Sequence, residues 1–114
     1  MKDELFVEAK SKIELAGLAI IEAEYRPQLS GSWHIIVENT PLLRFSFDGQ
    51  SCWLILEEEI TGITIGLKIW KDIWIAQNLD SASINRGISL LVRRCRGHAS
   101  GMGSEINSEK REMS

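Results

Sequence analysis

Few side chains in this 114-residue chain have types and spacings that could support chemistry. Three consecutive glutamates, Glu57, Glu58 and Glu59, end a stretch of alternating apolar residues. In an extended strand Glu57 and Glu59 share one face, about 6.5–7 Å apart, which suits paired acid and base work on a sugar. The competing interpretation is a solvated strand end, because a general acid needs a desolvated site that raises its pKa.

Histidine and cysteine are equally sparse. Cys95 and His98 have the spacing C-x-x-H, and Cys52 and His34 could complete a set of four zinc ligands. Zinc sites in short chains usually show two closely spaced pairs. We therefore expect no metal or other cofactor, and we interpret both cysteines as small buried residues. His34 stands in an alternating run, which is typical of a histidine on a sheet surface.

The elements that must position these side chains are strands flanked by two helices. Apolar residues recur at every second position from about residue 18 to residue 77, with turn residues between the runs. Asp48-Gly49, between two such runs, is the strongest hairpin signal. The alternation predicts strands over 18–25, 33–38, 42–47, 51–59 and 63–69.

Helical spacing of apolar residues predicts one helix over 3–16 and a second over 81–96. Gly17 suits the left-handed residue after the first helix, and Gly97 is expected to end the second. Asp80 or Ser81 is expected to cap the start of the second helix. The alternation within the strands predicts these inward residues: Ala19, Ile21, Ala23, Tyr25, Trp33, Ile35, Val37, Leu43, Phe45, Phe47, Ile63, Ile65, Leu67 and Ile69.

Residues 70–77 fit both a strand and a helix. Because β-branched and aromatic residues dominate, we prefer a strand after a turn at Lys71-Asp72. A straight strand would place Trp70 and Trp74 on the face opposite Ile69, Ile73 and Ile75. Four tryptophans are too many for the inner face of one sheet, so exposed aromatics beside acids indicate an interface.

Together these elements predict an α+β fold, a two-layer sandwich. A mainly antiparallel sheet of five or six strands would carry the N-terminal and C-terminal helices on one face. Residues 1–96 form a single domain in this interpretation, and residues 97–114 form a flexible polar tail.

Charge and composition favour some classes of binding partner and argue against others. The net charge is −3, and residues 1–92 hold 8 basic and 13 acidic side chains. An acidic domain repels nucleic acid and attracts basic partners. The longest apolar run is far shorter than the roughly 20 residues of a membrane span, and no secretory signal is visible. We expect a cytoplasmic protein that binds neither nucleic acid nor membrane.

The order helix, antiparallel strands, helix, in an acidic chain without catalytic motifs, resembles small bacterial immunity proteins that neutralise a toxin. The resemblance covers residues 1–96 and implies that a basic nuclease is blocked by electrostatic complementarity. A second resemblance is to the cyanobacterial excision-controlling proteins. It is carried by Phe47-Asp48-Gly49 and Asp72-Ile73-Trp74-Ile75.

The leading hypothesis is a non-enzymatic protein-binding module, an immunity or antitoxin-type inhibitor that occludes a basic partner with an acidic, tryptophan-containing sheet surface. One alternative is a small hydrolase or ligand-binding domain using His34 with Glu57 and Glu59. Another is a homodimeric structural or regulatory protein. The expected partner-binding residues are Trp70, Trp74, Asp72, Glu57, Glu58, Glu59 and His34.

Overall fold

The computed structural model describes residues 3–60 and 69–100, and side chains as far as residue 96. Along the chain the elements are α1 (Asp3–Leu15), β1 (Ile20–Arg26), the short 3-10 helix η1 (Pro27–Leu29), β2 (Ser32–Val37), β3 (Leu43–Asp48), β4 (Trp53–Ile60), β5 (Ile69–Ala76) and α2 (Ser81–Ser100). The strands form one sheet in sequence order, and every neighbouring pair is antiparallel. Neither helix is both long enough and apolar enough to cross a membrane.

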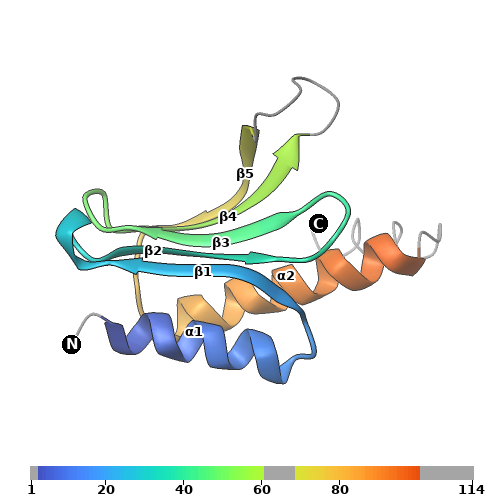
Figure 1. Ribbon diagram of the computed structural model, residues 1–114, viewed down its shortest axis with the longest axis horizontal. Helices are drawn as coiled ribbons and strands as arrows, with labels where there is room; N and C mark the ends of the chain where they lie inside the picture. Colours follow the sequence, from blue (N-terminus) through green and yellow to red (C-terminus); the bar gives the residue numbers. More distant parts are fainter. Residues whose placement is uncertain (1–2, 61–68, 101–114) are drawn as a thin grey trace.

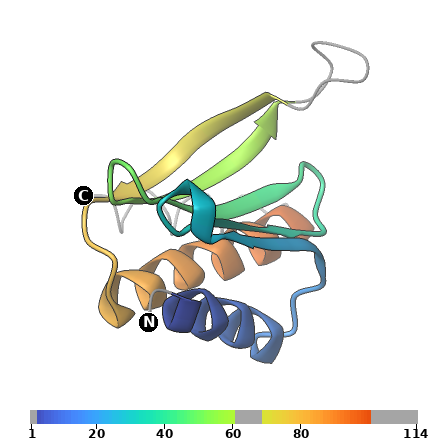
Figure 2. The same cartoon turned by 60° about the vertical axis from the view of Figure 1, so that its left-hand side comes forward.

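Both helices lie on the same face of the sheet, as Figure 1 and Figure 2 show from two directions. The predicted α+β two-layer architecture is confirmed, with five antiparallel strands in the described residues. Alternate residues of the central strands point at the helices and exclude water. The buried core consists of Ala9, Ile13, Trp33, Ile35, Val37, Leu43, Phe45, Phe47, Leu54, Leu56, Ile84, Ile88 and Leu91.

The end of α1 and the start of α2 are each closed by local hydrogen bonds. After α1, Gly17 adopts φ +87°, and the N–H groups of Gly17 and Leu18 donate to the carbonyls of Glu14 and Ile13. This is the pattern of a left-handed helix C-terminus, in which glycine carries no steric cost. At the start of α2, the Ser83 N–H donates to Asp80 Oδ1 at 2.8 Å, as expected of a capping aspartate.

A β-bulge in β1 changes the predicted inward face of that strand. Ile20 pairs with Val37 and Glu22 with Ile36, so Ile21 is an extra residue in the ladder. Ile20 packs against the core, whereas Ile21 is 54% exposed. The prediction that Ala19 and Ile21 point inward is therefore wrong, because an extra residue reverses the alternation on one side of the bulge. Beyond it Ala23 and Tyr25 point inward as predicted.

A second bulge lies in β5, where Leu56 pairs with Trp74 but Glu57 pairs with Asp72. Ile73 is the extra residue, and it brings Trp74 to the helix-covered face. The prediction that Trp74 shares the outer face with Trp70 is wrong for this reason. The prediction that Ile75 lies opposite Trp70 is also wrong, because Ile75 pairs with Ile55 on the same side of the sheet as Trp70 and is exposed. The predicted turn at Lys71-Asp72 is also wrong, since both residues lie within β5 and pair with β4.

Two further predictions concern the ends of elements. Helix α2 continues through Gly97 to Ser100, so the expectation that it ends at Gly97 is wrong. A glycine inside a helix costs only about 1 kcal/mol relative to alanine, too little to end α2 at that position. The predicted strand over 63–69 lies outside the described residues except for Ile69, which begins β5. Most of the predicted tail, residues 101–114, also lies outside the described residues.

Close contact between α2 and the sheet requires glycine at position 87. A Cβ atom there would lie 2.5 Å from Cε1 of Phe45 and 2.9 Å from Cζ3 of Trp74. Phe45 is fully buried, so its ring has little room to retreat in a close-packed interior. The helix therefore lies close to the sheet at the point where β3 and β5 present these two aromatic rings.

Replacing Gly87 with alanine should destabilise the protein although alanine favours helix. Overpacking costs roughly 1–3 kcal/mol, against a propensity gain of about 1 kcal/mol. We expect a net loss of up to about 2 kcal/mol in the free energy of unfolding, measured by urea denaturation. Ser89→Ala, at an exposed position of the same helix, is the matched control and should change stability by less than about 0.5 kcal/mol. Equal midpoints for both variants would contradict the close contact at Gly87.

The Asp80 cap should make the stability of the fold depend on pH in the acidic range. The Ser83 backbone N–H, helped by its hydroxyl, lowers the pKa of Asp80 below its ordinary value near 3.8. Because the folded pKa is depressed, the stabilisation is present above the unfolded value and is lost as pH falls through the lower folded value. The Asp80→Asn variant keeps an oxygen acceptor in its side chain but cannot titrate. Urea midpoints from about pH 7 to about pH 2 should show the wild type losing its advantage over Asp80→Asn in acid. A pH-independent difference would contradict this assignment.

Candidate functional site

The sheet surface that faces away from α1 and α2 is uncovered in the described structure, and we call it the open face. Its rows follow from the strand register, because residues directly opposite each other point to the same side. The open face comprises Glu22, Glu24, Arg26, Ser32, His34, Ile36, Arg44, Ser46, Asp48, Trp53, Ile55, Glu57, Glu59, Trp70, Asp72 and Ile75.

The open face is acidic. Among those residues six carry a carboxylate, namely Glu22, Glu24, Asp48, Glu57, Glu59 and Asp72, whereas only Arg26 and Arg44 carry a guanidinium group. Apolar side chains are interspersed with the charges. Trp53 is 39% exposed and Ile75 is 42% exposed. The open face therefore presents exposed apolar side chains among charged groups.

Glu57 is the most buried acid of the open face, at 8% exposure. Arg44 donates two hydrogen bonds to its carboxylate, from Nε to Oε1 at 2.8 Å and from Nη2 to Oε2 at 3.0 Å. The Ser46 hydroxyl donates to the same Oε1 at 3.0 Å. A carboxylate held by a bidentate arginine and a hydroxyl has its acceptor sites largely satisfied. Its role is structural cross-linking of β3 and β4, which differs from the acid or base role considered for Glu57 and Glu59.

Arg44 also stacks on an indole ring. Its guanidinium carbon lies 4.5 Å from the centroid of the Trp70 ring, within the range of a cation–π contact. Trp70 is directly opposite Glu59 in the β4–β5 ladder. Arg44 thus joins Glu57 on β4 to Trp70 on β5, and the flat Trp70 ring is held at the open face.

Glu58 and Trp74, which the sequence placed with this surface, lie on the helix side. Glu58 pairs with Arg94 of α2 at 2.9 Å and approaches Lys71 at 3.8 Å. Trp74 packs against the core, close to Gly87. Of the predicted residues, Trp70, Asp72, Glu57, Glu59 and His34 share the open face, while Glu58 and Trp74 do not.

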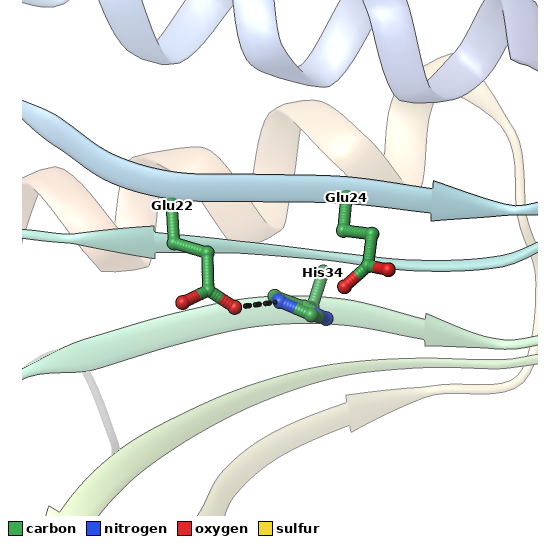
Figure 3. A group of neighbouring side chains, drawn as sticks. All are labelled: Glu22, Glu24 and His34. Carbon is green, nitrogen blue, oxygen red and sulfur yellow. Dashed lines mark hydrogen bonds and ion pairs between the residues drawn. The ribbon is translucent and has the colours of Figure 1, made fainter.

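His34 forms a group with two glutamates of β1, as Figure 3 shows. Its Nε2 atom lies 2.6 Å from Oε2 of Glu22, and Glu24 stands directly opposite it in the β1–β2 ladder. Arg26 donates to Oε1 of Glu24 at 2.8 Å, and this bond lowers the pKa of Glu24. The hydrolase hypothesis paired His34 with Glu57 and Glu59, whereas the bonded partner of His34 is Glu22.

A shallow depression of about 200 Å³ adjoins His34 at the end of the open face near η1. Its lining includes Arg26, Ser32, Asp48 and Ser46.

The two cysteines considered from the sequence as zinc ligands lie in different parts of the fold. Cys52 lies in the β3–β4 turn and is exposed, so the prediction that it is a small buried residue is wrong. Cys95 lies on α2 and is partly buried, and burial raises the pKa of its thiol. The His98 side chain lies outside the described side chains.

Sequence reasoning missed Arg44, Glu22 and Glu24 as members of this surface. Arg44 stands between Leu43 and Phe45, so strict alternation already placed it outward. What alternation could not supply was the register that sets Arg44 opposite Glu57 and Glu24 opposite His34.

Comparison with known proteins gave no match: no family model, no curated protein and no solved structure is significantly similar to this chain.

Truncating Arg44 should lower the free energy of unfolding by more than is usual for an arginine at the protein surface. Arg44→Ala leaves the buried Glu57 carboxylate with only the Ser46 hydroxyl and removes the contact with Trp70. Breaking a buried, hydrogen-bonded pair on one side costs several kcal/mol, and Arg44 is partly exposed, so we expect a loss of about 2–4 kcal/mol by urea denaturation. Lys71→Ala, which removes the longer contact of an exposed lysine with Glu58, should cost less than about 1 kcal/mol. Similar losses for both variants would contradict the proposed weight of the Arg44–Glu57 pair.

Proposed function

We propose that this protein is a cytoplasmic, non-enzymatic protein-binding module, an immunity or antitoxin-type inhibitor that occludes a basic partner with its open face. One observation carries the proposal. The uncovered side of the sheet holds six carboxylates against two guanidinium groups, with Trp70, Ile55 and Ile75 among them.

The charged side chains would mainly speed the association of a basic partner and orient it on the open face. Acidic groups on one face raise the local concentration of a basic partner and speed association, an effect that salt screens. Arg44 already neutralises Glu57, so the outward field comes chiefly from the other acids. Asp72 is exposed at the edge strand β5, where it would meet an approaching cationic side chain early.

Affinity would come from apolar anchors. A tryptophan immobilised before binding loses little conformational entropy when a partner covers it, and tryptophan is enriched among the residues that dominate binding energy. The contact with Arg44 holds Trp70 in this way. Ile55 and Ile75 are cross-strand neighbours, and the exposed fraction of Ile75 gives a partner apolar surface to bury.

Inhibition by occlusion needs no chemistry in the inhibitor itself. A rigid, acidic surface that covers the cationic substrate-binding groups of a toxin would exclude the substrate of that toxin. The contacts of the described acids fit this role. Glu57 is bound to Arg44 and Ser46, and Glu24 is bound to Arg26, so these pairs keep the surface rigid while the other acids supply its net charge.

The test uses the product of the gene beside the one for this protein as the candidate partner. Trp70→Ala should weaken the complex about thirtyfold or more, as expected when an anchoring tryptophan is lost. Asp72→Lys should slow association and reduce its salt dependence. Both effects would be measured by surface plasmon resonance at low and high salt, and co-expression with the variants should fail to relieve toxicity.

The matched control is Glu14→Lys, which makes the same charge change at an exposed position of α1. We expect it to bind like the wild type apart from a small effect of net charge. Equal weakening by Glu14→Lys and Asp72→Lys would show that net charge alone drives association. Full binding by both open-face variants would remove the open face from the interaction.

A further inference from the structure

Three side chains on the open face have the donor types of a metal site. Glu22, Glu24 and His34 each bring one ligand atom to within 4.8 Å of those of the other two. Figure 3 shows both carboxylates extending from β1 toward the imidazole on β2. This is the one such group of three in the described residues. It is separate from the Arg44, Glu57 and Trp70 contacts and uses different side chains.

The sheet itself places these donors. Glu22 and Glu24 are two residues apart on β1 and therefore point to the same side. Glu24 and His34 are direct partners in the antiparallel ladder, where opposite Cβ atoms lie about 4.5–5.5 Å apart. The His34 side chain is 17% exposed and the Glu22 side chain is 56% exposed. A mostly buried imidazole on a paired strand thus faces a carboxylate that can still adjust its rotamer.

The donor spacing is close to what a small divalent ion needs. Ligand bonds of about 2.0–2.2 Å in a tetrahedral arrangement separate the donor atoms by roughly 3.3 Å. The Nε2 atom of His34 and Oε2 of Glu22 are 2.6 Å apart, so an ion between them requires Glu22 to retreat by somewhat less than 1 Å. No pair of donor atoms is more than 4.8 Å apart, so no pair has to close by more than about 1.5 Å. Glutamate side chains span both changes by rotation.

We propose that Glu22, Glu24 and His34 bind one divalent transition-metal ion, with zinc as the best-suited ion and water completing its coordination. One imidazole nitrogen with two carboxylate oxygens is a borderline donor set that suits zinc better than magnesium or calcium. Arg26 holds Oε1 of Glu24 and leaves Oε2 for the ion. An outer partner of this kind fixes the orientation of a ligand, although the positive charge of this one lowers the affinity of the site.

The other metal-binding side chains of the chain provide the controls. Cys52 lies in the β3–β4 turn and Cys95 lies on α2, so neither belongs to this group. His98 is the second of two histidines in the sequence, which makes His98→Gln the matched counterpart of His34→Gln. Thiolate ligation would be revealed by an intense charge-transfer band of bound Co²⁺, whereas nitrogen and oxygen donors give only weak bands.

The experiment is isothermal titration of the full chain with zinc chloride, repeated for each variant. We expect one ion per chain with a dissociation constant in the micromolar range. His34→Gln and the exposed-residue variant Glu24→Gln should each weaken binding at least about tenfold, while His98→Gln should match the wild type. Co²⁺ bound to the wild type should show no thiolate band. Circular dichroism would verify that each variant is folded, and Glu24→Gln keeps the test valid if His34→Gln is not.

Three results would overturn the proposal. The first is binding only at millimolar zinc, which any cluster of surface carboxylates can produce. The second is unchanged zinc affinity in both His34→Gln and Glu24→Gln. The third is loss of zinc binding in His98→Gln or a strong thiolate band with Co²⁺, either of which would assign the ion to His98 or to a cysteine instead of this group.

Discussion

The burial of alternate strand residues beneath two helices is the constraint on which the rest of this structure depends. Helices α1 and α2 cover the same face of the sheet, so the inward residues of β2 and β3 are all apolar, as are Leu54 and Leu56 of β4, and their neighbours face away. The aromatic rings of Phe6, Trp33, Phe45 and Phe47 pack against one another in this layer. The same alternation gathers the polar residues on the open face. The chemistry of that face is therefore a consequence of how the core is built.

Much of this architecture could be predicted from the period of the sequence. The inward faces of β2 and β3, the two helices and the capping residues Gly17 and Asp80 follow from local patterns, and the structure confirms them. The predictions failed at the positions where one strand contains an extra residue. Ile21 and Ile73 each shift the register, and alternation alone does not show whether a strand is bulged. Trp74 moved to the core side for that reason, and Trp70 did not.

The chemistry of the open face depended on pairing between strands, which a single sequence does not contain. Arg44 lies 13 residues from Glu57 along the chain and forms two hydrogen bonds with it, while Glu24 and His34 meet across β1 and β2. The pairing gives similar acids different roles. Glu57 is neutralised and cross-links two strands, Glu58 ties the sheet to α2, and Glu24 is bound to Arg26 within β1. A metal on β1 and a protein partner over β4 and β5 would use different parts of one surface.

The central claim is that partners approach the side of the sheet opposite the helices, and the four indole N–H signals test it most directly. Trp53 is on the open face and Trp33 is buried in the core, while Trp70 faces outward and Trp74 faces α2. In a ¹H–¹⁵N correlation spectrum recorded while the neighbouring gene product is added, the account predicts shifts of the Trp70 and Trp53 signals, with Trp33 and Trp74 nearly unchanged. Shifts concentrated at Trp33 and Trp74, or no shift at any indole at saturating partner, would contradict it.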